Sequence, residues 1–330
     1  MPEVLIVGQA EVPDLLPMDR CIDLMADTLS AVARGEAELP LRQMVPLPAG
    51  ILATMPASIF GVAGVKVITV FPGNEGTELD SHQGIVVLYE MERGTPLALV
   101  DATSVTAVRT AAVSGAATRA LAREDAGDLA ILGSGTQART HLEAMAAVRD
   151  LRRVRVWSRT AENAHRFAER GSEHRGTPVE VVASAKEAVE GADIVCTTTS
   201  AREPVLLGEW LSPGAHVNAV GYGGREGREL DGAAVARARM FGDRRESVEN
   251  ESGDYLLARA ERAIGADHLA GELGEVLTGK VEGRTSPEDI TLFESLGLAV
   301  EDVAAVKLIH ETAAATGAGT RVDLGGLRQE

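Results

Sequence analysis

The sequence predicts an α/β protein that combines a Rossmann-type parallel-sheet dinucleotide domain with a second domain of α+β type. Three observations support this prediction. A glycine-rich turn follows a short apolar strand near the middle of the chain. Strands and helices alternate after Gly127, whereas residues 1–104 combine one amphipathic helix with several strand-like runs.

The glycine turn is the most informative segment. Residues 129–132 form an apolar run typical of a buried strand, and they lead into Gly133-x-Gly135-x-x-Ala138 and a helical pattern. The first glycine allows a tight turn, the second lets the backbone approach a pyrophosphate, and the alanine keeps the helix close to the strand. Free N–H groups and the helix dipole favour an anion there. We therefore predict dinucleotide contacts from Gly133, Ser134, Gly135, Thr136 and Gln137.

The second predicted strand, residues 154–157, ends at a segment that bears on the choice of cofactor. Enzymes that select NAD usually place Asp or Glu here, about 20 residues past the glycines, to bind the ribose 2′-hydroxyl. This chain has Ser158-Arg159-Thr160 instead. A guanidinium and two hydroxyls suit a 2′-phosphate, so NADP(H) is favoured over NAD(H). The alternative is that Arg159 is a solvated residue at the start of a helix.

The segment before the glycine turn shows a different pattern. Apolar residues at helical spacing predict an amphipathic helix over residues 18–34 that ends at Gly35. A helix crowded with small residues is predicted over residues 104–122, capped by Thr103 or Ser104. Between these helices lie four strand-like runs, the last two forming a hairpin: residues 50–55, 62–71, 84–90 and 96–100.

Beyond Gly127 the alternation of strands and helices predicts a parallel sheet. The strands are expected at residues 129–132, 154–157, 179–182, 194–197, 216–220 and 240–241. The intervening helices are expected at residues 138–147, 161–169 and 185–190. A last apolar helix over residues 298–316 is expected to return to the first domain. The predicted division is therefore 1–118 with 298–330 for the α+β domain, and 119–297 for the dinucleotide domain.

Composition narrows the class of protein. The chain has 330 residues, enough for about two domains, and its 45% hydrophobic content is ordinary for a globular protein. A formal net charge of −17 argues against a nucleic-acid partner, because such proteins present a basic face. We expect no membrane span and no signal peptide, since no apolar run is long enough. Two cysteines are too few for a disulfide framework, so we predict a cytoplasmic protein, and we predict no metal site.

Three basic residues stand out in the α+β domain. Period-two alternation puts Lys66 on the same strand face as apolar neighbours, which indicates either an edge strand protected by its lysine or a buried functional ammonium. Arg109 is the only charge in the middle of an apolar, small-residue helix, where a guanidinium needs an anionic partner. No such partner is near in sequence. Together with Arg42, these residues form a candidate clamp for a carboxylate.

Segments spread along the chain resemble the ornithine cyclodeaminase/mu-crystallin family over essentially the whole length. They are Lys66 in its strand, Ser81-His-Gln83, Arg109-Thr-Ala-Ala112, Gly133-Ser-Gly-Thr-Gln-Ala138, Val217-Asn-Ala-Val-Gly221, Arg228-Glu-Leu-Asp231, Glu251-Ser-Gly-Asp254, Gly271-Glu-Leu-Gly-Glu275 and Phe293-Glu-Ser-Leu-Gly-Leu-Ala-Val-Glu-Asp302. Together these segments are far more specific than the glycine turn alone.

The resemblance implies a homodimer in which the first domain binds substrate and pairs the subunits, with the nicotinamide at the domain cleft. It implies that the carboxylate of a small imino or amino acid is bound by Arg42, Lys66 and Arg109, of which Lys66 and Arg109 are the predicted catalytic residues. It also implies further cofactor contacts, from Ser81, His82, Arg109, Thr110, Ser158, Arg159, Thr160, Asn163, Thr198, Val220 and Ser295.

One departure from the family pattern bears on the reaction. The cyclodeaminases carry a catalytic Asp in a Gly-Gly-Asp-x-Pro-Gly-Lys segment, and counting back from Glu229 puts Gly223 at that position, with Arg225 in place of the usual Pro. Without the Asp, the base that activates water for loss of ammonia is missing. A reductase needs less from the protein, because the cofactor carries the hydride.

The sequence therefore favours an NAD(P)H-dependent reductase of imino acids. Its substrate would be a ketimine such as Δ1-pyrroline- or piperideine-2-carboxylate, and in reverse the enzyme would be an amino-acid dehydrogenase. Two alternatives stay open. One is cyclodeamination of L-ornithine to L-proline and ammonia with catalytic NAD, and the other is non-catalytic, NADPH-dependent binding of a small ligand.

Overall fold

We describe the protein from a computed structural model, in which residues 3–74, 76–175, 178–221 and 224–324 are described. The chain divides into two compact units: unit 1 comprises Met1–Arg109 and Leu298–Glu330, and unit 2 comprises Thr110–Gly297. The first boundary falls after Arg109 rather than after Thr118. The reason is that the first turns of the helix between the units bond to residues of unit 1.

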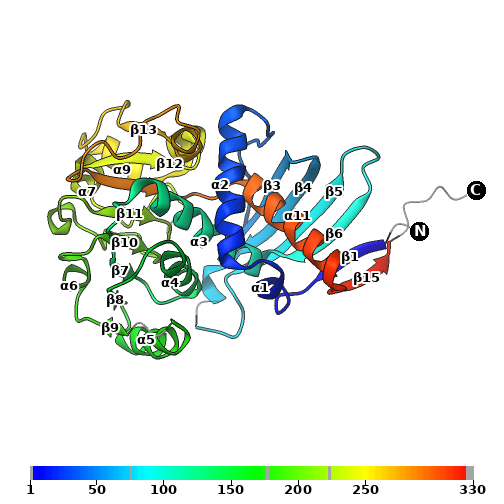
Figure 1. The fold of residues 1–330 in the computed structure, drawn as a ribbon, viewed down its shortest axis with the longest axis horizontal. Helices are drawn as coiled ribbons and strands as arrows, with labels where there is room; N and C mark the ends of the chain where they lie inside the picture. Colours follow the sequence, from blue (N-terminus) through cyan, green and yellow to red (C-terminus); the bar gives the residue numbers. More distant parts are fainter. Residues whose placement is uncertain (1–2, 75, 176–177, 222–223, 325–330) are drawn as a thin grey trace, which may run out of the picture. The chain divides into compact units, whose positions relative to one another are not determined.

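Unit 1 is built on a seven-stranded mixed sheet with the order β15-β1-β6-β5-β4-β3-β2 (Figure 1). Neighbouring strands are antiparallel except β1 and β6, which are parallel. The four predicted strands are present. β1, β2 and β15 are additional, and each is too short for its alternation to be distinct in sequence. The strands are β1 (Glu3–Val7), β2 (Gln43–Leu47), β3 (Gly50–Ile59), β4 (Val62–Val70), β5 (His82–Glu90), β6 (Pro96–Asp101) and β15 (Thr320–Asp323).

Helix α11 (Ala299–Thr316) packs along one face of this sheet, against β3, β4, β5 and β6 (Figure 1). Gly64 shows how close the approach is, because a Cβ atom on it would lie 2.9 Å from Val303 of the helix. Since side chains alternate along a strand, Lys66 lies on the same face as Gly64. The alternation of β4 therefore points Lys66 toward α11.

The amphipathic helix predicted for residues 18–34 is confirmed as α2 (Met18–Arg34), which packs against α11. Gly35 ends it with a φ of 76°, the left-handed conformation that glycine adopts at helix ends. The short helix α1 (Val12–Leu15) and the 3-10 turn η1 (Pro72–Asn74) complete the described elements of unit 1.

Helix α3 (Ala102–Leu121) begins earlier than predicted and has a different cap. The side chain of Asp101 accepts a hydrogen bond from the Ser104 N–H at 2.8 Å, so Asp101 caps the helix rather than Thr103 or Ser104. The two hydroxyls make other bonds. Thr103 Oγ1 donates to the carbonyl of His82, and Ser104 Oγ donates to the carbonyl of Gln9.

Unit 2 is a Rossmann-type domain with a parallel eight-stranded sheet in the order β13-β12-β14-β11-β10-β7-β8-β9. The chain runs from β7 outward to β9 and then returns to β10 on the other side of β7, which makes the β7/β10 junction the topological switch point. The strands are β7 (Asp128–Leu132), β8 (Arg153–Trp157), β9 (Val179–Val181), β10 (Ile194–Thr197), β11 (His216–Ala219), β12 (Ala238–Gly242), β13 (Leu269–Glu272) and β14 (Ile290–Glu294). The helices are α4 (Thr136–Val148), α5 (Ala161–Arg175), α6 (Ala185–Val189), α7 (Gly232–Arg237), α8 (Arg245–Glu251), α9 (Gly253–Ala260) and α10 (Leu273–Leu277), with the 3-10 turn η2 (Gly208–Trp210).

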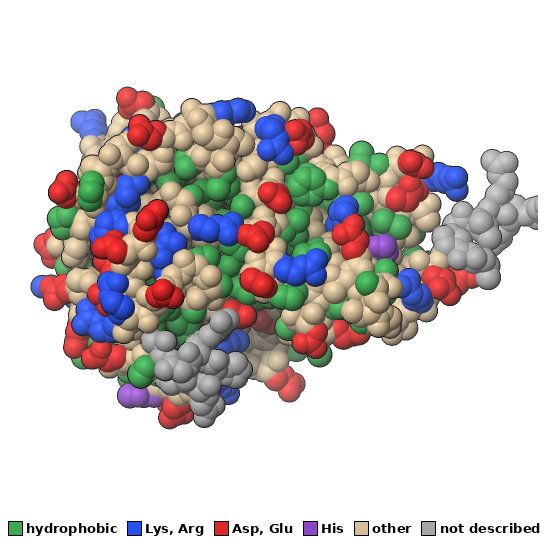
Figure 2. Space-filling model, viewed as in Figure 1, with side chains coloured by type: hydrophobic (Ala, Val, Ile, Leu, Met, Phe, Trp, Pro, Cys, Tyr) green, Lys and Arg blue, Asp and Glu red, His purple; other side chains and the backbone are tan. Residues whose placement is uncertain are grey.

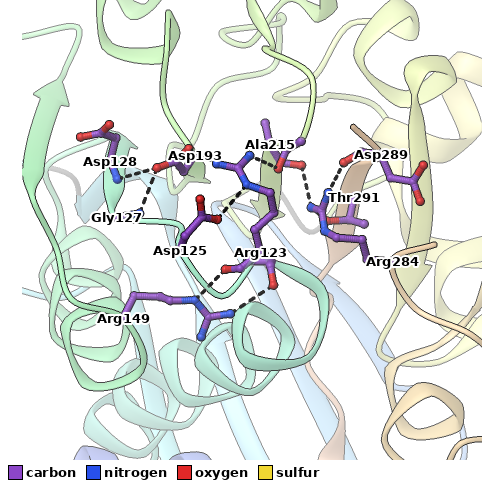
Figure 3. Close-up of polar contacts among 12 residues, drawn as sticks. Arg123, Asp125, Gly127, Asp128, Arg149, Asp193, Ala215, Arg284, Asp289 and Thr291 are labelled. Atoms are coloured by element: carbon purple, nitrogen blue, oxygen red, sulfur yellow. Dashed lines mark hydrogen bonds and ion pairs between the residues drawn. The ribbon is translucent and has the colours of Figure 1, made fainter. Parts of the chain in front are cut away.

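At the amino-terminal edge of this sheet, arginine side chains bond to the chain around the end of α3, and Figure 3 shows Arg149 directed at Arg123 there. Arg149 donates to the carbonyls of Thr118 and Ala122 at 2.8 and 3.2 Å, and Arg284 donates to the carbonyl of Leu121 at 2.8 Å. Carbonyl groups at a helix end have no partner within the helix. The two guanidinium groups therefore cap α3 at its carboxyl end and hold it to unit 2.

Acidic and basic side chains are interspersed over the face drawn in Figure 2. The acidic side chains responsible for the strongly negative formal charge are thus mixed with basic side chains on that face. Among the described residues, none of the helices combines the length and the apolar character needed to span a membrane.

Candidate active site

Lys66 lies in β4, between β3 and β5, with Met55 and Val86 as its cross-strand neighbours. β4 is therefore an interior strand, and the interpretation of Lys66 as the guard of an edge strand is wrong. Only 2% of the side chain is exposed. Its ammonium donates to Thr106 Oγ1 at 2.7 Å and to Asp302 Oδ1 at 3.1 Å. The buried ammonium that the sequence left as an alternative is what the structure shows.

Arg109 in α3 is also buried, and its partners are acidic residues of the protein itself. Nη1 lies 2.9 Å from Glu301 Oε2, and Nε lies 2.9 Å from Asp302 Oδ1. No anionic partner is apparent near Arg109 in the sequence, because these acids lie 192 and 193 residues further along the chain. Two carboxylates of unit 1 thus hold the Arg109 guanidinium in place.

Arg109 and Arg42 both lie within electrostatic reach of Lys66. The pKa of Lys66 is lowered to about 8, mainly by burial; the carboxylate of Asp302 opposes this shift, whereas the positive charges of Arg109 and Arg42 add to it. Arg42 immediately precedes β2 at the edge of the same sheet. Residues that are far apart in sequence are therefore assembled around one ammonium group.

Ser81 and His82 lie at the start of β5, in the same unit. The Asp80 carboxylate accepts from the His82 N–H at 2.9 Å, and Ser81 Oγ lies 3.3 Å from His82 Nδ1. Desolvation and the charge of Lys66 lower the pKa of His82, which places this ring near the ammonium. At neutral pH the ring is therefore uncharged and can accept a hydrogen bond.

Glu301 and Asp302 are site residues that the sequence analysis quoted but did not assign. They begin α11, and both are fully buried. Burial raises the pKa of Asp302, but the charges of Arg109 and Lys66 outweigh it and hold the pKa below its ordinary value. The available signal was two adjacent acids in the first turn of an otherwise apolar helix, where burial requires partners of opposite charge.

In unit 2 the glycine turn has the geometry that a dinucleotide requires. Gly133 has a φ of 120°, and a Cβ atom there would lie 2.6 Å from Thr198 Oγ1. Gly135 begins α4 without a side-chain cap, and no atom lies within 4 Å of where its Cβ would be. Ala138, in the first turn of α4, is fully buried. The turn therefore offers open space above uncapped N–H groups at a helix start, which fits a pyrophosphate.

The other predicted cofactor residues of unit 2 follow the carboxyl ends of neighbouring parallel strands. Ser134 Oγ donates to Ser158 Oγ at 2.9 Å, which links the turns after β7 and β8. Thr198 donates through its N–H and its hydroxyl to the Leu132 carbonyl, which joins the ends of β10 and β7. Val220 and Ser295 come directly after β11 and β14. Ligands of such sheets bind outside these strand ends, at the switch point.

Two of these residues have buried polar atoms that lack a hydrogen-bond partner among the described residues. They are Oε1 of Gln137 and Oγ of Ser295. Buried polar atoms are normally paired, so both atoms suit a polar ligand. Arg159 and Thr160 are exposed, and the Thr160 carbonyl accepts from the Asn163 N–H at the start of α5. The residues present therefore fit a bound dinucleotide.

Comparison with known proteins decides the family. The model of the ornithine cyclodeaminase/mu-crystallin family matches residues 3–317. The chain belongs to this family. The resemblance drawn from the sequence is thereby confirmed.

Three relatives illustrate the similarity within the ornithine cyclodeaminase/mu-crystallin family. The ketimine reductase mu-crystallin of Mus musculus is 42% identical over 282 residues, which cover 84% of this chain and 86% of the relative. The structure of Thermococcus litoralis Δ1-pyrroline-2-carboxylate reductase in complex with NADH and L-proline has a TM-score of 0.94 and 37% identity, and covers 97% of this chain and 100% of that one. An archaeal alanine dehydrogenase dimer with bound NAD has a TM-score of 0.93 and 34% identity, covering 98% and 100%.

The departure from the cyclodeaminase pattern falls partly outside the described residues. Gly223 is not among them, and Arg225, two residues later, is exposed. The chain near this position is held by an acid, Glu229, for which the sequence predicted no role. Glu229 accepts from the N–H of Thr199 at 2.6 Å and from the N–H of Gly221 at 2.7 Å, so one carboxylate fixes the loops after β10 and β11.

Proposed function

We propose that this protein is an NAD(P)H-dependent reductase that reduces the C=N bond of an imino acid, a ketimine such as Δ1-pyrroline- or piperideine-2-carboxylate. In reverse it would act as an amino-acid dehydrogenase. The observation that carries the proposal is the buried ammonium of Lys66 with Arg109 and Arg42 within its electrostatic reach. The three positive charges exceed the two negative charges of Glu301 and Asp302 by one. This excess suits one substrate carboxylate.

Lys66 has the properties of a proton donor to the substrate nitrogen. An ammonium group has three hydrogens, and the bonds to Thr106 and Asp302 use two of them. Thr106 Oγ1 donates its own hydrogen to the Ala102 carbonyl at 2.6 Å, so it must accept from Lys66. Because these two acceptors fix the orientation of the ammonium, they also set the direction of its third N–H bond. A pKa of about 8 suits a group that gives up its proton near neutral pH.

A dinucleotide bound by the glycine turn would supply the hydride, and the protein would supply position and charge. The residues that would hold it in unit 2 are those at the strand ends: Gly133, Ser134, Gly135, Thr136, Gln137, Ser158, Arg159, Thr160, Asn163, Thr198, Val220 and Ser295. In unit 1 and at the start of unit 2 we assign the same role to Ser81, His82, Arg109 and Thr110. The related reductase and alanine dehydrogenase structures contain NADH and NAD, respectively, which supports a nicotinamide cofactor here.

We further propose that NADP(H) is preferred over NAD(H). Support comes from the segment Ser158-Arg159-Thr160 after β8, which has two hydroxyls, a guanidinium and no carboxylate. An Arg159→Asp variant should shift the preference toward NADH, since a carboxylate repels the 2′-phosphate and accepts from a 2′-hydroxyl. The ratio of kcat/KM for the two cofactors measures this. An unchanged ratio would mean that Arg159 does not contact the 2′-phosphate.

We also propose a homodimer formed through the sheet of unit 1. One sheet face is covered by α11, whereas the other carries apolar side chains that are half-buried or exposed in the single chain. They are Val45, Leu52, Val65, Val67, Ile85, Val87, Leu97 and Leu99. Apolar patches of this kind mark subunit interfaces, and the related archaeal alanine dehydrogenase is a dimer.

The test of the proposed reaction is a substrate panel run with NADH and with NADPH. We expect oxidation of the reduced cofactor with cyclic ketimines, followed by absorbance, and loss of that activity in Lys66→Ala with nearly unchanged dinucleotide affinity. Lys307→Ala is the matched control, because Lys307 lies on the surface of α11 and pairs with Glu311. Ammonia release from ornithine would instead support cyclodeamination, and binding without turnover would support a ligand-binding protein.

A further inference from the structure

Two adjacent acids at the start of α11 face the two buried bases, and they bind them differently. Glu301 bonds to Arg109, whereas Asp302 Oδ1 accepts both from Lys66 Nζ at 3.1 Å and from Arg109 Nε at 2.9 Å. One oxygen atom therefore sets the spacing between the ammonium and the guanidinium. Among the bonds that the structure describes, only Asp302 joins these bases to each other.

The two oxygens of this carboxylate differ in their partners, as do those of the buried Glu294. Asp302 is fully buried, and its Oδ2 has no hydrogen-bond partner among the described residues. Glu229 in unit 2 provides the contrast, since both its oxygens are bonded. A buried acceptor without a hydrogen bond is unfavourable, so the attraction of the two bases is what compensates the buried charge of Asp302. The negative charge of Asp302 is thus directed at the two bases alone.

We propose that Asp302 is a positioning residue for the reaction proposed above: it keeps Lys66 protonated as the acid and holds it at a fixed distance from Arg109. The inference rests on the proposed function. In the reduction, the imine nitrogen takes a proton from the Lys66 ammonium while a hydride from the reduced nicotinamide is added to the carbon. The products are the amine, the oxidised nicotinamide and a neutral Lys66, which then takes a proton from solvent.

The charges around Lys66 define the effects that Asp302 must balance. Arg109 on α3 and Arg42 before β2 disfavour the ammonium, and His82 on β5 is a further titratable group within reach of it. Asp302 on α11 is the acid that favours the charged form of Lys66, while Glu301, on the same helix, is bonded to Arg109. Burial alone would drive Lys66 to its neutral form. Loss of the Asp302 charge should therefore leave Lys66 neutral near physiological pH.

The charge is tested with Asp302→Asn, and Glu301→Gln is the matched control. Both variants remove one buried carboxylate from the same helix turn, but only Asp302 contacts Lys66. In Asp302→Asn, the basic limb of the pH profile of kcat/KM for ketimine reduction should move to lower pH by about one unit or more. At pH values above both limbs, the kcat/KM of the variant should then be lower than that of the parent by about tenfold for each pH unit by which the limb has moved. In Glu301→Gln the limb should stay where it is in the parent protein.

A second readout does not depend on activity. Titration of the Lys66 ammonium by NMR in lysine-labelled protein should show a lower pKa in Asp302→Asn and an unchanged one in Glu301→Gln. Equal limbs and equal titrations in the two variants would overturn the inference. A parent protein without ketimine reduction would instead refute the proposed function, and the NMR titration would still report on Asp302.

Positioning is tested with Asp302→Glu, which retains the charge and lengthens the side chain by one methylene. We expect the basic limb near its parent position, a kcat at least tenfold lower, and dinucleotide affinity within a factor of about two. This variant decides the question if Asp302→Asn does not fold. A parent-like kcat in Asp302→Glu would show that the fixed spacing of Lys66 and Arg109 is not required.

Discussion

Arg109 has two partners in unit 1, which changes what its substitution should do. If the guanidinium bonded only to a substrate, lysine could replace it without loss of stability of the free protein. In the structure, Nε and Nη1 bind two different carboxylates, Asp302 and Glu301, in a geometry that a single ammonium cannot reproduce.

We therefore predict that Arg109→Lys lowers the stability of the free protein as well as its activity. Breaking a buried ion pair typically costs about 3–5 kcal/mol, and a lysine that keeps one partner should lose up to this amount. Urea denaturation without ligands measures the change. Arg34→Lys is the control, because Arg34 pairs with Glu36 at the surface. A free protein as stable as its parent would show that the pairs contribute little and that Arg109 serves the substrate.

Asp254 is a second residue whose environment has a measurable consequence. Burial raises its pKa to about 7, although its Oδ1 accepts from the N–H groups of Glu229 and Leu230. In the unfolded chain the pKa of an Asp is about 3.9. Between these two values the folded state retains a proton that the unfolded state has lost, so stability declines as pH rises through this window and levels off above about pH 7.

Asp254→Asn should remove this contribution, because the amide oxygen can still accept both hydrogen bonds but carries no charge. We expect the denaturation midpoint of the parent protein to fall between pH 5 and pH 7 more steeply than that of the variant. Asp231→Asn is a control, since Asp231 caps α7 with the same type of bond. Parallel pH profiles for parent and Asp254→Asn would contradict the assignment.

At the residue scale, single chemically unusual positions could be predicted and their partners could not. Lys66 and Arg109 stand out because a charge interrupts an apolar pattern. Glu301 and Asp302 lie almost two hundred residues further on, and no local spacing relates them to the bases. The same holds for Glu229, whose role depends on backbone N–H groups of two separate loops.

At the scale of elements, α3 is a helix with polar side chains bound at both of its ends. Asp101 caps its start, and the guanidinium groups of Arg149 and Arg284 bind the carbonyls at its end. A helix poor in large side chains has little apolar surface with which to fix its position. Polar contacts at both ends therefore add to the packing of its buried small side chains.

Arg149→Met should accordingly destabilise unit 2. Arg149 donates to the carbonyls of Thr118, Ala122 and Arg123, and its loss leaves part-buried carbonyls without these donors. We expect a loss of about 3 kcal/mol in the free energy of unfolding, measured by urea denaturation. Arg119→Met, at an exposed position of the same helix, should cost much less. Equal effects of the two substitutions would argue against a specific role of the cap.

Element prediction succeeded where period or punctuation was clear, as for α2 with its apolar stripe and Gly35. It failed for β14, a fully buried strand between β11 and β12. All five of its residues are buried, including Thr291 and Glu294, so no alternation appears, and the polar residues obscure the apolar run. The caps of α3 were also assigned wrongly, because Thr103 and Ser104 bond to distant carbonyls that the sequence does not reveal.

At the scale of the whole molecule, the uncovered sheet face of unit 1 leads to a prediction about assembly. Ile85 is 44% exposed, and its neighbour across the strands is Val67 on the same face. We expect Ile85→Asp to convert a dimer into monomers, because a carboxylate in an apolar interface is strongly unfavourable. Light scattering after size exclusion gives the mass. Met91→Asp, in the exposed turn after β5, is the control and should leave the mass unchanged. A monomeric parent protein would refute the proposed dimer.

The discontinuity of unit 1 also has a consequence for the order in which the protein forms during synthesis. Unit 2 is complete when Gly297 has been made, whereas β4 and the first turns of α3, up to Arg109, belong to unit 1 and must wait for α11, which is made later. Domains generally fold as units as they emerge from the ribosome, so unit 2 can fold while unit 1 cannot. Until Glu301 and Asp302 arrive, Lys66 and Arg109 lack these two counter-charges, and their burial is strongly unfavourable. The synthesis of α11 therefore completes the group of charged residues around Lys66 and closes the hydrophobic core of unit 1 in the same event.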